Sequence, residues 1–203
     1  MTIRKGEPWG RSGALPSNGV IIRTDAEANQ IVNHAIQNGE EIPTLGLMGG
    51  DLARALGATG SDERLRSAAA QTLPLDLGVA TFNGNTTYFV AHLVIRQLWW
   101  QGRFVAVMNS DFFGPWKLAP RAHPNDGLLD ALDGSLGFND RLKARKLALT
   151  GEHVPHPDLT IRRGKEHHIT LARLTPVWID GTKSARTKEV VIRVVPDALQ
   201  CVV

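Results

Sequence analysis

The clearest candidate for chemistry is a turn of two glycines followed by an aspartate, Gly49-Gly50-Asp51. Glycine carries no Cβ, so the backbone amides of such a turn stay open to a ligand. A helix that begins at Asp51 would direct its first N–H groups to the same place, and exposed amides at a helix start bind anions. We therefore expect Gly49, Gly50 and Asp51 to form an anion site.

Other residues of reactive type are less well arranged. His153 and His156 are separated by Pro155 in a rigid loop, while His167 and His168 are strand neighbours that would point to opposite faces. No third ligand is spaced to join either pair, so we expect no histidine metal site. No nucleophile elbow supports Ser-His-Asp catalysis.

Aromatic residues gather between Leu98 and Trp116, with Trp99-Trp100 and Phe112-Phe113 among them. Core packing accounts for such a group. An acyl-chain groove or an interface would use the same residues, and the sequence leaves these interpretations open.

The elements that must position these residues change in type along the chain. The first part alternates strand and helix: strands are expected at Val20–Ile22 and Pro43–Met48, and a helix capped by Thr24 or Asp25 ends at Gly39. Two further helices are expected, one from Asp51 to Gly57 and one over Asp62–Gln71. A Gly- and Pro-rich arm over residues 6–18 should dock through Trp9.

Strand signals dominate the rest, interrupted by one helix expected at Asn139–Leu149. The expected strands are Leu75–Phe82, Thr86–Val94, Phe104–Met108, Leu128–Leu132, Leu159–Ile161, His168–Leu174, Pro176–Ile179 and Val190–Val195. We therefore predict an α+β fold with a partial α/β part at residues 1–72 and a larger antiparallel β-sandwich-like domain at residues 73–203.

Composition limits the classes of partner. The 203 residues carry 23 Lys and Arg against 20 Asp and Glu, a net charge of +3 that does not predict a nucleic-acid partner. Basic residues cluster at 141–146, 162–165 and 183–188, where phosphates, anionic lipids or an acidic partner could bind, or where they simply face solvent. The single cysteine, Cys201, fits a reducing compartment, so we expect a cytoplasmic protein, and membrane contact, if any, should be peripheral.

Four segments in order resemble landmarks of the diacylglycerol and sphingosine lipid kinase family. Residues 23–33 resemble its Gly-Gly-Asp-Gly-Thr turn and following helix through Asp25, Asn29 and Asn33. Residues 45–57 resemble its second glycine loop and Ala-Arg-x-Leu-Gly helix. Residues 75–90 resemble the entry to its β domain, together with Ala-Pro and Asn-Asp-Gly at residues 119–127. The fourth segment is Asp180-Gly181 with the Pro-x-Ala-Leu ending at residues 196–199.

The resemblance implies a Rossmann-like nucleotide half and a set of site residues. Asp25, Gly49, Gly50 and Asp51 would bind the cofactor, Mg²⁺ and ATP if kinase activity is retained. Asp180 would be the general base for a lipid hydroxyl, although Asp-Gly is also a common hairpin turn. Asp126, with the carbonyl of Leu128, would ligate a structural Mg²⁺, although Asn-Asp-Gly equally shapes a turn.

The chain departs from the family pattern at the first turn and in length. Arg23, Thr24, Ala26 and Glu27 stand where the family has glycines, and fewer than 25 residues precede the segment that resembles its third strand. We therefore expect a truncated, degenerate nucleotide half. The predicted function is a catalytically impaired lipid kinase-like protein that binds a lipid, an anion or a protein partner. An active divergent lipid kinase, completed by dimerisation or by a partner chain, is the alternative.

Overall fold

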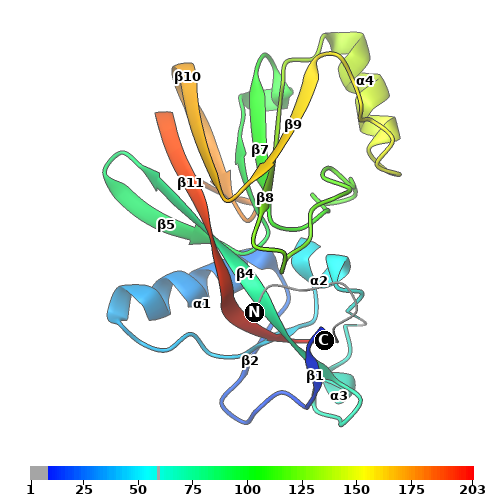
Figure 1. Ribbon diagram of the computed structural model, residues 1–203, viewed down its shortest axis with the longest axis vertical. Coiled ribbons are helices and arrows are strands. Elements are labelled where there is room, and N and C mark those ends of the chain that lie inside the picture. The colour runs from blue at the N-terminus through cyan, green and yellow to red at the C-terminus, as the bar shows by residue number, and fades with distance from the viewer. Residues whose placement is uncertain (1–8, 59) are drawn as a thin grey trace.

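A computed structural model describes residues 9–58 and 60–203 of the chain. Within these residues one curved sheet of eleven strands carries four α-helices and a 3₁₀ turn (Figure 1). The elements in order are β1 Arg11–Ser12, β2 Val20–Ile22, α1 Asp25–Asn38, β3 Leu45–Leu47, α2 Asp51–Ala55, α3 Asp62–Leu65, β4 Gln71–Phe82, β5 Asn85–Phe89, β6 His92–Ile95, η1 Leu98–Trp100, β7 Phe104–Met108, β8 Leu129–Gly134, α4 Phe138–Leu147, β9 Leu159–Gly164, β10 Glu166–Ile179 and β11 Thr182–Val202.

The first part has the predicted alternation of strand and helix, with β2 and β3 parallel to each other. Thr24 caps α1 by accepting a hydrogen bond from the amide of Glu27, and Gly39 ends α1 in the left-handed conformation. The helix predicted over Asp62–Gln71 is wrong beyond Leu65. The hydroxyl of Ser67 donates to the carbonyl of Arg64 and accepts from the amide of Ala69, and these local bonds replace the helical ones.

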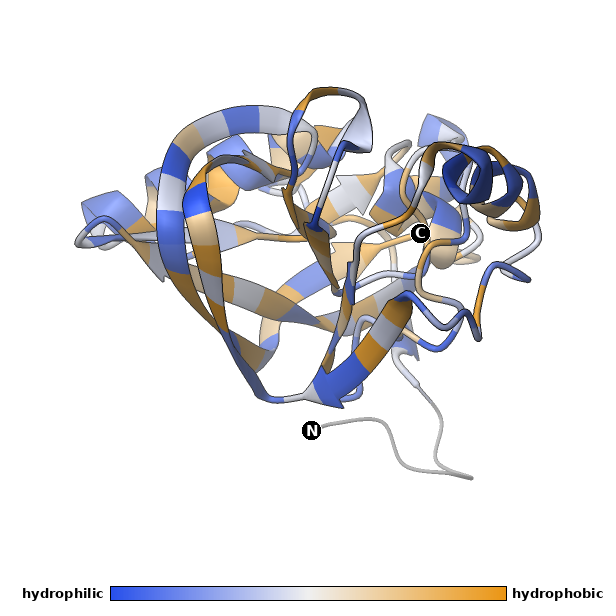
Figure 2. Ribbon diagram, turned by 90° about the horizontal axis from the view of Figure 1, so that it is seen from above, coloured by the Kyte–Doolittle hydropathy of each residue, from blue (hydrophilic) through white to orange (hydrophobic). Residues whose placement is uncertain are grey.

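The β-rich part closes around a core of side chains from β4 to β8, β10 and β11, which confirms the predicted β-sandwich-like architecture. Hydrophilic and hydrophobic residues alternate along its long strands (Figure 2). Three predicted strands are divided differently in the structure. Thr86–Val94 is broken at Val90 and Ala91, whose amides bond to Asp180 instead of to a neighbouring strand. The segments 168–174 and 176–179 form one strand, β10, with an irregular register.

Strand β11 connects the two parts. Its first half pairs with β10 and β4, and after a bulge near Asp197 its end at Cys201–Val202 pairs with β3 in parallel. Strand β4 also crosses the predicted boundary at residue 72. Side chains from both sides of residue 72 pack in one core. The position of the domain boundary remains a prediction.

Helix α4 lies at one end of the molecule, beside the loop that follows β7 (Figure 1). None of its ten residues is buried. Below it, a smaller core of β6, β7 and β8 side chains is covered by residues 118–119 and 136. Trp9 donates its indole N–H to the carbonyl of Pro74 at 3.4 Å, so the arm docks by this residue as predicted, while residues 6–8 lie outside the described part.

Candidate functional site

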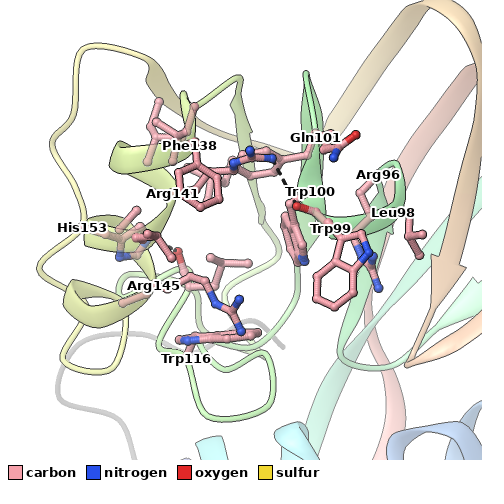
Figure 3. A pocket seen from close by; sticks show the side chains of 18 residues that line it. Arg96, Leu98, Trp99, Trp100, Gln101, Trp116, Phe138, Arg141, Arg145 and His153 are labelled. Atoms are coloured by element: carbon pink, nitrogen blue, oxygen red, sulfur yellow. Dashed lines mark hydrogen bonds between the residues drawn. The ribbon is translucent and has the colours of Figure 1, made fainter.

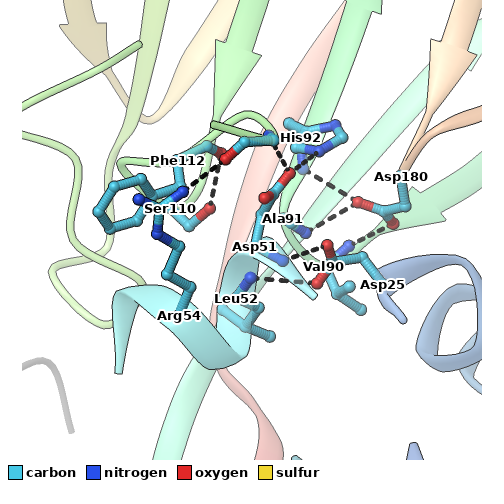
Figure 4. Close-up of polar contacts among 11 residues, drawn as sticks. Asp25, Asp51, Leu52, Arg54, Val90, Ala91, His92, Ser110, Phe112 and Asp180 are labelled. Atoms are coloured by element: carbon cyan, nitrogen blue, oxygen red, sulfur yellow. Dashed lines mark hydrogen bonds and ion pairs between the residues drawn. The ribbon is translucent and has the colours of Figure 1, made fainter. Parts of the chain in front are cut away.

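Asp25 is the first residue of α1, and its carboxylate is turned toward the start of α2 (Figure 4). One oxygen accepts the amide of Asp51 at 2.6 Å, and the other accepts the amide of Leu52 at 3.1 Å. These two N–H groups are the ones that a helix start offers to an anion. In this chain they are already occupied by a carboxylate of the protein itself.

The two glycines of the turn are needed for close approach between these segments. A Cβ on Gly50 would lie 2.6 Å from a carboxylate oxygen of Asp25, and a Cβ on Gly49 would lie 2.4 Å from the carbonyl oxygen of Arg23. Gly50 also has φ 98°, which disfavours any L side chain. The turn therefore packs against residues 23–25 and is not an open cradle.

Asp51 continues the network toward the β-rich part. Its carboxylate lies 3.0 Å from Nε2 of His92 and accepts the amide of Gly114 at 2.9 Å. The imidazole of His92 meets the ring of Phe113 edge-on, and its Nδ1 is buried without a hydrogen-bond partner. Asp51 thus ties the start of α2 to β6 and to the loop after β7.

Asp180 lies just after β10 and is 3% exposed. One oxygen accepts the amide of Val90 at 2.8 Å and the side-chain amide of Asn29 at 3.1 Å. The other accepts the amides of Ala91 and His92 at 2.9 and 3.0 Å. Four donors therefore surround this carboxylate, which explains why the predicted long strand over residues 86–94 breaks at this point.

Burial and neighbouring charges shift the pKa values of the cluster. Burial raises the pKa of Asp25 to about 6, against the two amide hydrogen bonds that lower it. Burial also raises the pKa of Asp180, partly opposed by His92. Burial lowers the pKa of His92, but the bond to Asp51 and the nearby carboxylates raise it by more, so it lies above the ordinary value. The cluster favours a protonated His92 between carboxylates.

The structure brings together most of the predicted site residues and adds one that was missed. Asp25, Gly50, Asp51 and Asp180 form one network, with Gly49 in the adjoining turn. Ligand-type atoms of Asp25, Asp51 and His92 all lie within 4.8 Å of one another. No sequence motif points to His92, which lies inside a predicted strand.

Asp126 and Leu128 lie apart from this cluster. The carboxylate of Asp126 accepts the amide of Leu128 at 3.0 Å and forms an ion pair with Arg163, which also lies 3.6 Å from Asp130. A guanidinium thus stands beside the carboxylate that was predicted to hold Mg²⁺. The turn is further fixed by the buried Asp76, which accepts the amide of Gly127. The metal role of Asp126 and Leu128 stays a prediction.

Four residues of the predicted aromatic group, Trp99, Trp100, Phe104 and Trp116, line a cavity of about 560 Å³ between η1 and α4 (Figure 3), whereas Phe112 and Phe113 are not part of its lining. Its lining includes three tryptophans and three arginines and no carboxylate: Arg96, Leu98, Trp99, Trp100, Gln101, Phe104, Trp116, Leu118, Leu132, Leu136, Phe138, Arg141, Leu142, Ala144, Arg145, Ala148, His153 and Leu159. The guanidinium groups lie on aromatic rings, Arg145 on Trp116 at 5.1 Å and Arg96 on Trp100 at 5.3 Å.

Residues 64–203 match the family model of the YegS C-terminal NAD kinase beta sandwich-like domain. The chain belongs to this family. The predicted resemblance to the diacylglycerol kinase-like lipid kinases is thereby confirmed at the level of family and fold. A comparison with curated protein sequences gives no match.

Solved structures from Bacillus anthracis str. Sterne share the fold. One is a diacylglycerol kinase with a TM-score of 0.64 and 18% identity, covering 91% of this chain and 75% of that chain. Two others carry the same assignment provisionally, with TM-scores of 0.65 and 0.67, identities of 18% and 16%, and coverage of 91% of this chain and 77% of theirs. Among the described residues, no helix has the length and apolar character needed to span a bilayer.

Proposed function

We propose that this lipid kinase-like protein does not transfer phosphate from ATP and that it binds a lipid with an acidic head group. The observation that carries the first half is the position of the Asp25 carboxylate, which accepts the amides of Asp51 and Leu52. A phosphate group would have to displace it from both. A cytoplasmic location is part of the proposal.

Electrostatics adds to this competition. A phosphate at the start of α2 would join Asp25 and Asp51, whose carboxylate oxygens lie within 4.8 Å of each other. A phosphate charge about 5 Å from one of these carboxylates would be repelled by about 3 kcal/mol at an effective dielectric constant near 20. The repulsion would apply to each neighbouring carboxylate, so ATP binding needs a cation to offset it.

The residues present do not fit Mg²⁺, the cation that ATP would bring. Mg²⁺ prefers oxygen ligands in an octahedral arrangement. The ligand-type cluster consists of Asp25, Asp51 and His92. Both oxygens of Asp25 already accept backbone amides, Oδ2 of Asp51 accepts the amide of Gly114 and contacts His92, and the third group is an imidazole nitrogen and not an oxygen. These groups therefore do not support a phosphoryl-transfer step at this site.

The cavity between η1 and α4 supports the second half of the proposal. Its aromatic and aliphatic walls suit an acyl chain, and its three arginines without a carboxylate suit a phosphate or carboxylate head group. Burial lowers the pKa of His153 at the cavity wall, so this imidazole stays neutral and the positive charge comes from the arginines.

Nucleotide binding is tested by calorimetric titration with Mg-ATP and by a radiolabelled transfer assay with diacylglycerol in mixed micelles. We expect no binding heat at millimolar nucleotide and no labelled lipid. Turnover that disappears in Asp180→Asn would refute the proposal and would favour the alternative, an active divergent kinase. The convergence of Asp25, Asp51 and Asp180 is the observation that speaks for that alternative.

Lipid binding is tested with a short-chain phosphatidic acid below its micelle concentration, followed by tryptophan fluorescence. Trp99, Trp100 and Trp116 line the cavity, so filling it should change their emission. Arg145→Gln should weaken binding about tenfold, in line with the loss of one charge-assisted hydrogen bond. Arg11→Gln, exposed on β1 at the end of the molecule opposite α4 (Figure 1), is the matched control and should bind like the wild type.

A further inference from the structure

The end of the molecule formed by η1 and α4 exposes an unusual amount of apolar side chain. Leu98 and Trp99 are 72% and 73% exposed, and Phe138 and Leu142 on α4 are 68% and 48% exposed. Within the part of the chain that the structure describes, six of the ten most exposed large apolar residues lie at residues 98–99 and 138–149. Such a concentration at one end of the molecule marks a candidate binding surface.

These four apolar residues also line the mouth of the cavity, so we call them the rim. Arg141 of α4 connects the two elements by donating to the carbonyl of Trp99 at 3.3 Å, and its guanidinium also lies over the ring of Phe138 on the same helix (Figure 3). The rim therefore surrounds the entrance to the site that the proposed function assigns to a lipid.

Helix α4 is not explained by packing alone. A helix of this length is marginally stable in water unless it buries an apolar face, yet none of the residues of α4 is buried. In Figure 2 the same helix is coloured largely as hydrophilic. It thus offers Phe138 and Leu142, one turn apart, to something outside the chain.

The charge of α4 indicates what that partner is. The helix carries four basic residues, Arg141, Lys143, Arg145 and Lys146, and one acidic residue, Asp140. Only Lys143 pairs with that carboxylate, at 3.8 Å. The remaining cations have no ion-pair partner among the described residues, so the partner is anionic.

The backbone of η1 adds a second, independent observation. Trp99 and Trp100 both have φ 57°, in the left-handed region that bulky residues rarely adopt. Leu98 and Trp99, at this unusual turn, are largely exposed to solvent. Tryptophan with neighbouring basic residues is the composition that favours the boundary between water and lipid.

We propose that the rim and α4 dock on the surface of an anionic lipid bilayer. Leu98, Trp99 and Phe138 would enter the head-group region while the cations of α4 contact lipid phosphates. A second copy of the chain is a poorer occupant, because a symmetric contact at this face would set arginines against arginines. The inference extends the proposed function by giving the bilayer as the source of the lipid.

The test is co-sedimentation with phosphatidylcholine vesicles, with and without phosphatidylglycerol, at two salt concentrations. We expect binding only to the anionic vesicles, weakened by salt. Trp99→Ala should weaken it at least tenfold, and Lys146→Gln about fivefold, the effect of one basic residue near an anionic surface. Val20→Ala on β2 and Arg11→Gln on β1, exposed positions at the end of the molecule opposite α4 (Figure 1), should bind like the wild type.

Equal binding to neutral and anionic vesicles, or unchanged binding of Trp99→Ala and of a second rim variant, Phe138→Ser, would overturn the proposal. So would a wild-type dimer that Phe138→Ser dissociates and that ignores vesicles, or capture only by an acidic protein. Thermal melts of each variant control for folding. The short-chain lipid separates the two proposals: if it binds while vesicles do not, only the docking inference fails, and if vesicles bind while it does not, only the lipid-site proposal fails.

Discussion

Replacing Asp180 by asparagine should strongly destabilise the fold. Each oxygen of this buried carboxylate accepts two N–H donors, three of the four coming from the backbone of residues 90–92. In Asp180→Asn one oxygen becomes an NH₂ group. Whichever way the asparagine amide turns, two of the four N–H groups then face its NH₂ group and lose their acceptor oxygen.

The magnitude follows from these contacts. A buried donor that loses its acceptor costs about 1–3 kcal/mol, so two such donors give about 2–6 kcal/mol. Removing a buried charge offsets part of this, since burial raises the pKa of Asp180 and so disfavours its ionised form. We expect a net loss of about 3 kcal/mol, which for a chain of this size lowers the melting temperature by about 6–12 °C.

The assay is urea unfolding followed by far-UV circular dichroism, with the slope on denaturant compared between variants. Asp158→Asn, at an exposed position, is the matched control and should change stability by less than about 0.5 kcal/mol. If Asp180→Asn behaves like this control, the carboxylate does not organise the break between β5 and β6. A variant that keeps its stability but loses a measurable kinase activity would support the general-base role instead.

Three further predictions concern pH, packing and metal. The free energy of unfolding should fall as pH rises from 4 to 6, because burial raises the pKa of Asp25 from 3.8 to about 6 and the folded chain then binds more protons than the unfolded chain. In urea titrations at each pH, the free energy of unfolding of Asp25→Asn should depend less on pH than that of the wild type. An equal pH dependence would contradict this. Gly78→Ala should cost about 1–3 kcal/mol in urea unfolding, because its Cβ would lie 2.1 Å from the ring of Phe89, whereas Gly164→Ala, whose Cβ meets nothing within 3.6 Å, should be tolerated. Arg163→Ala should make thermal melting depend on Mg²⁺ by freeing the carboxylates that this guanidinium neutralises, and a Mg²⁺ response of the wild type would contradict the reasoning.

Local patterns were sufficient for much of the fold. The helical spacing after Thr24, the glycine stop at residue 39 and the alternation along the later strands each depend on neighbours in sequence, and the structure has all three. The same patterns misplaced the end of α3, where side-chain bonds of Ser67 compete with the helix. They also missed the break at Val90 and Ala91, because its cause is a carboxylate about ninety residues away.

The sequence by itself determined that acidic and glycine residues lie at the turns after strands and at helix starts, since turn chemistry is local. Only the tertiary structure decided what these groups do. It aims Asp25 at the amides of α2, sets the unforeseen His92 beside Asp51, and gives Asp126 an arginine as its partner. Such pairings join segments dozens of residues apart, and they depend on how β11 and β4 carry the chain between its two parts, which no local pattern specifies.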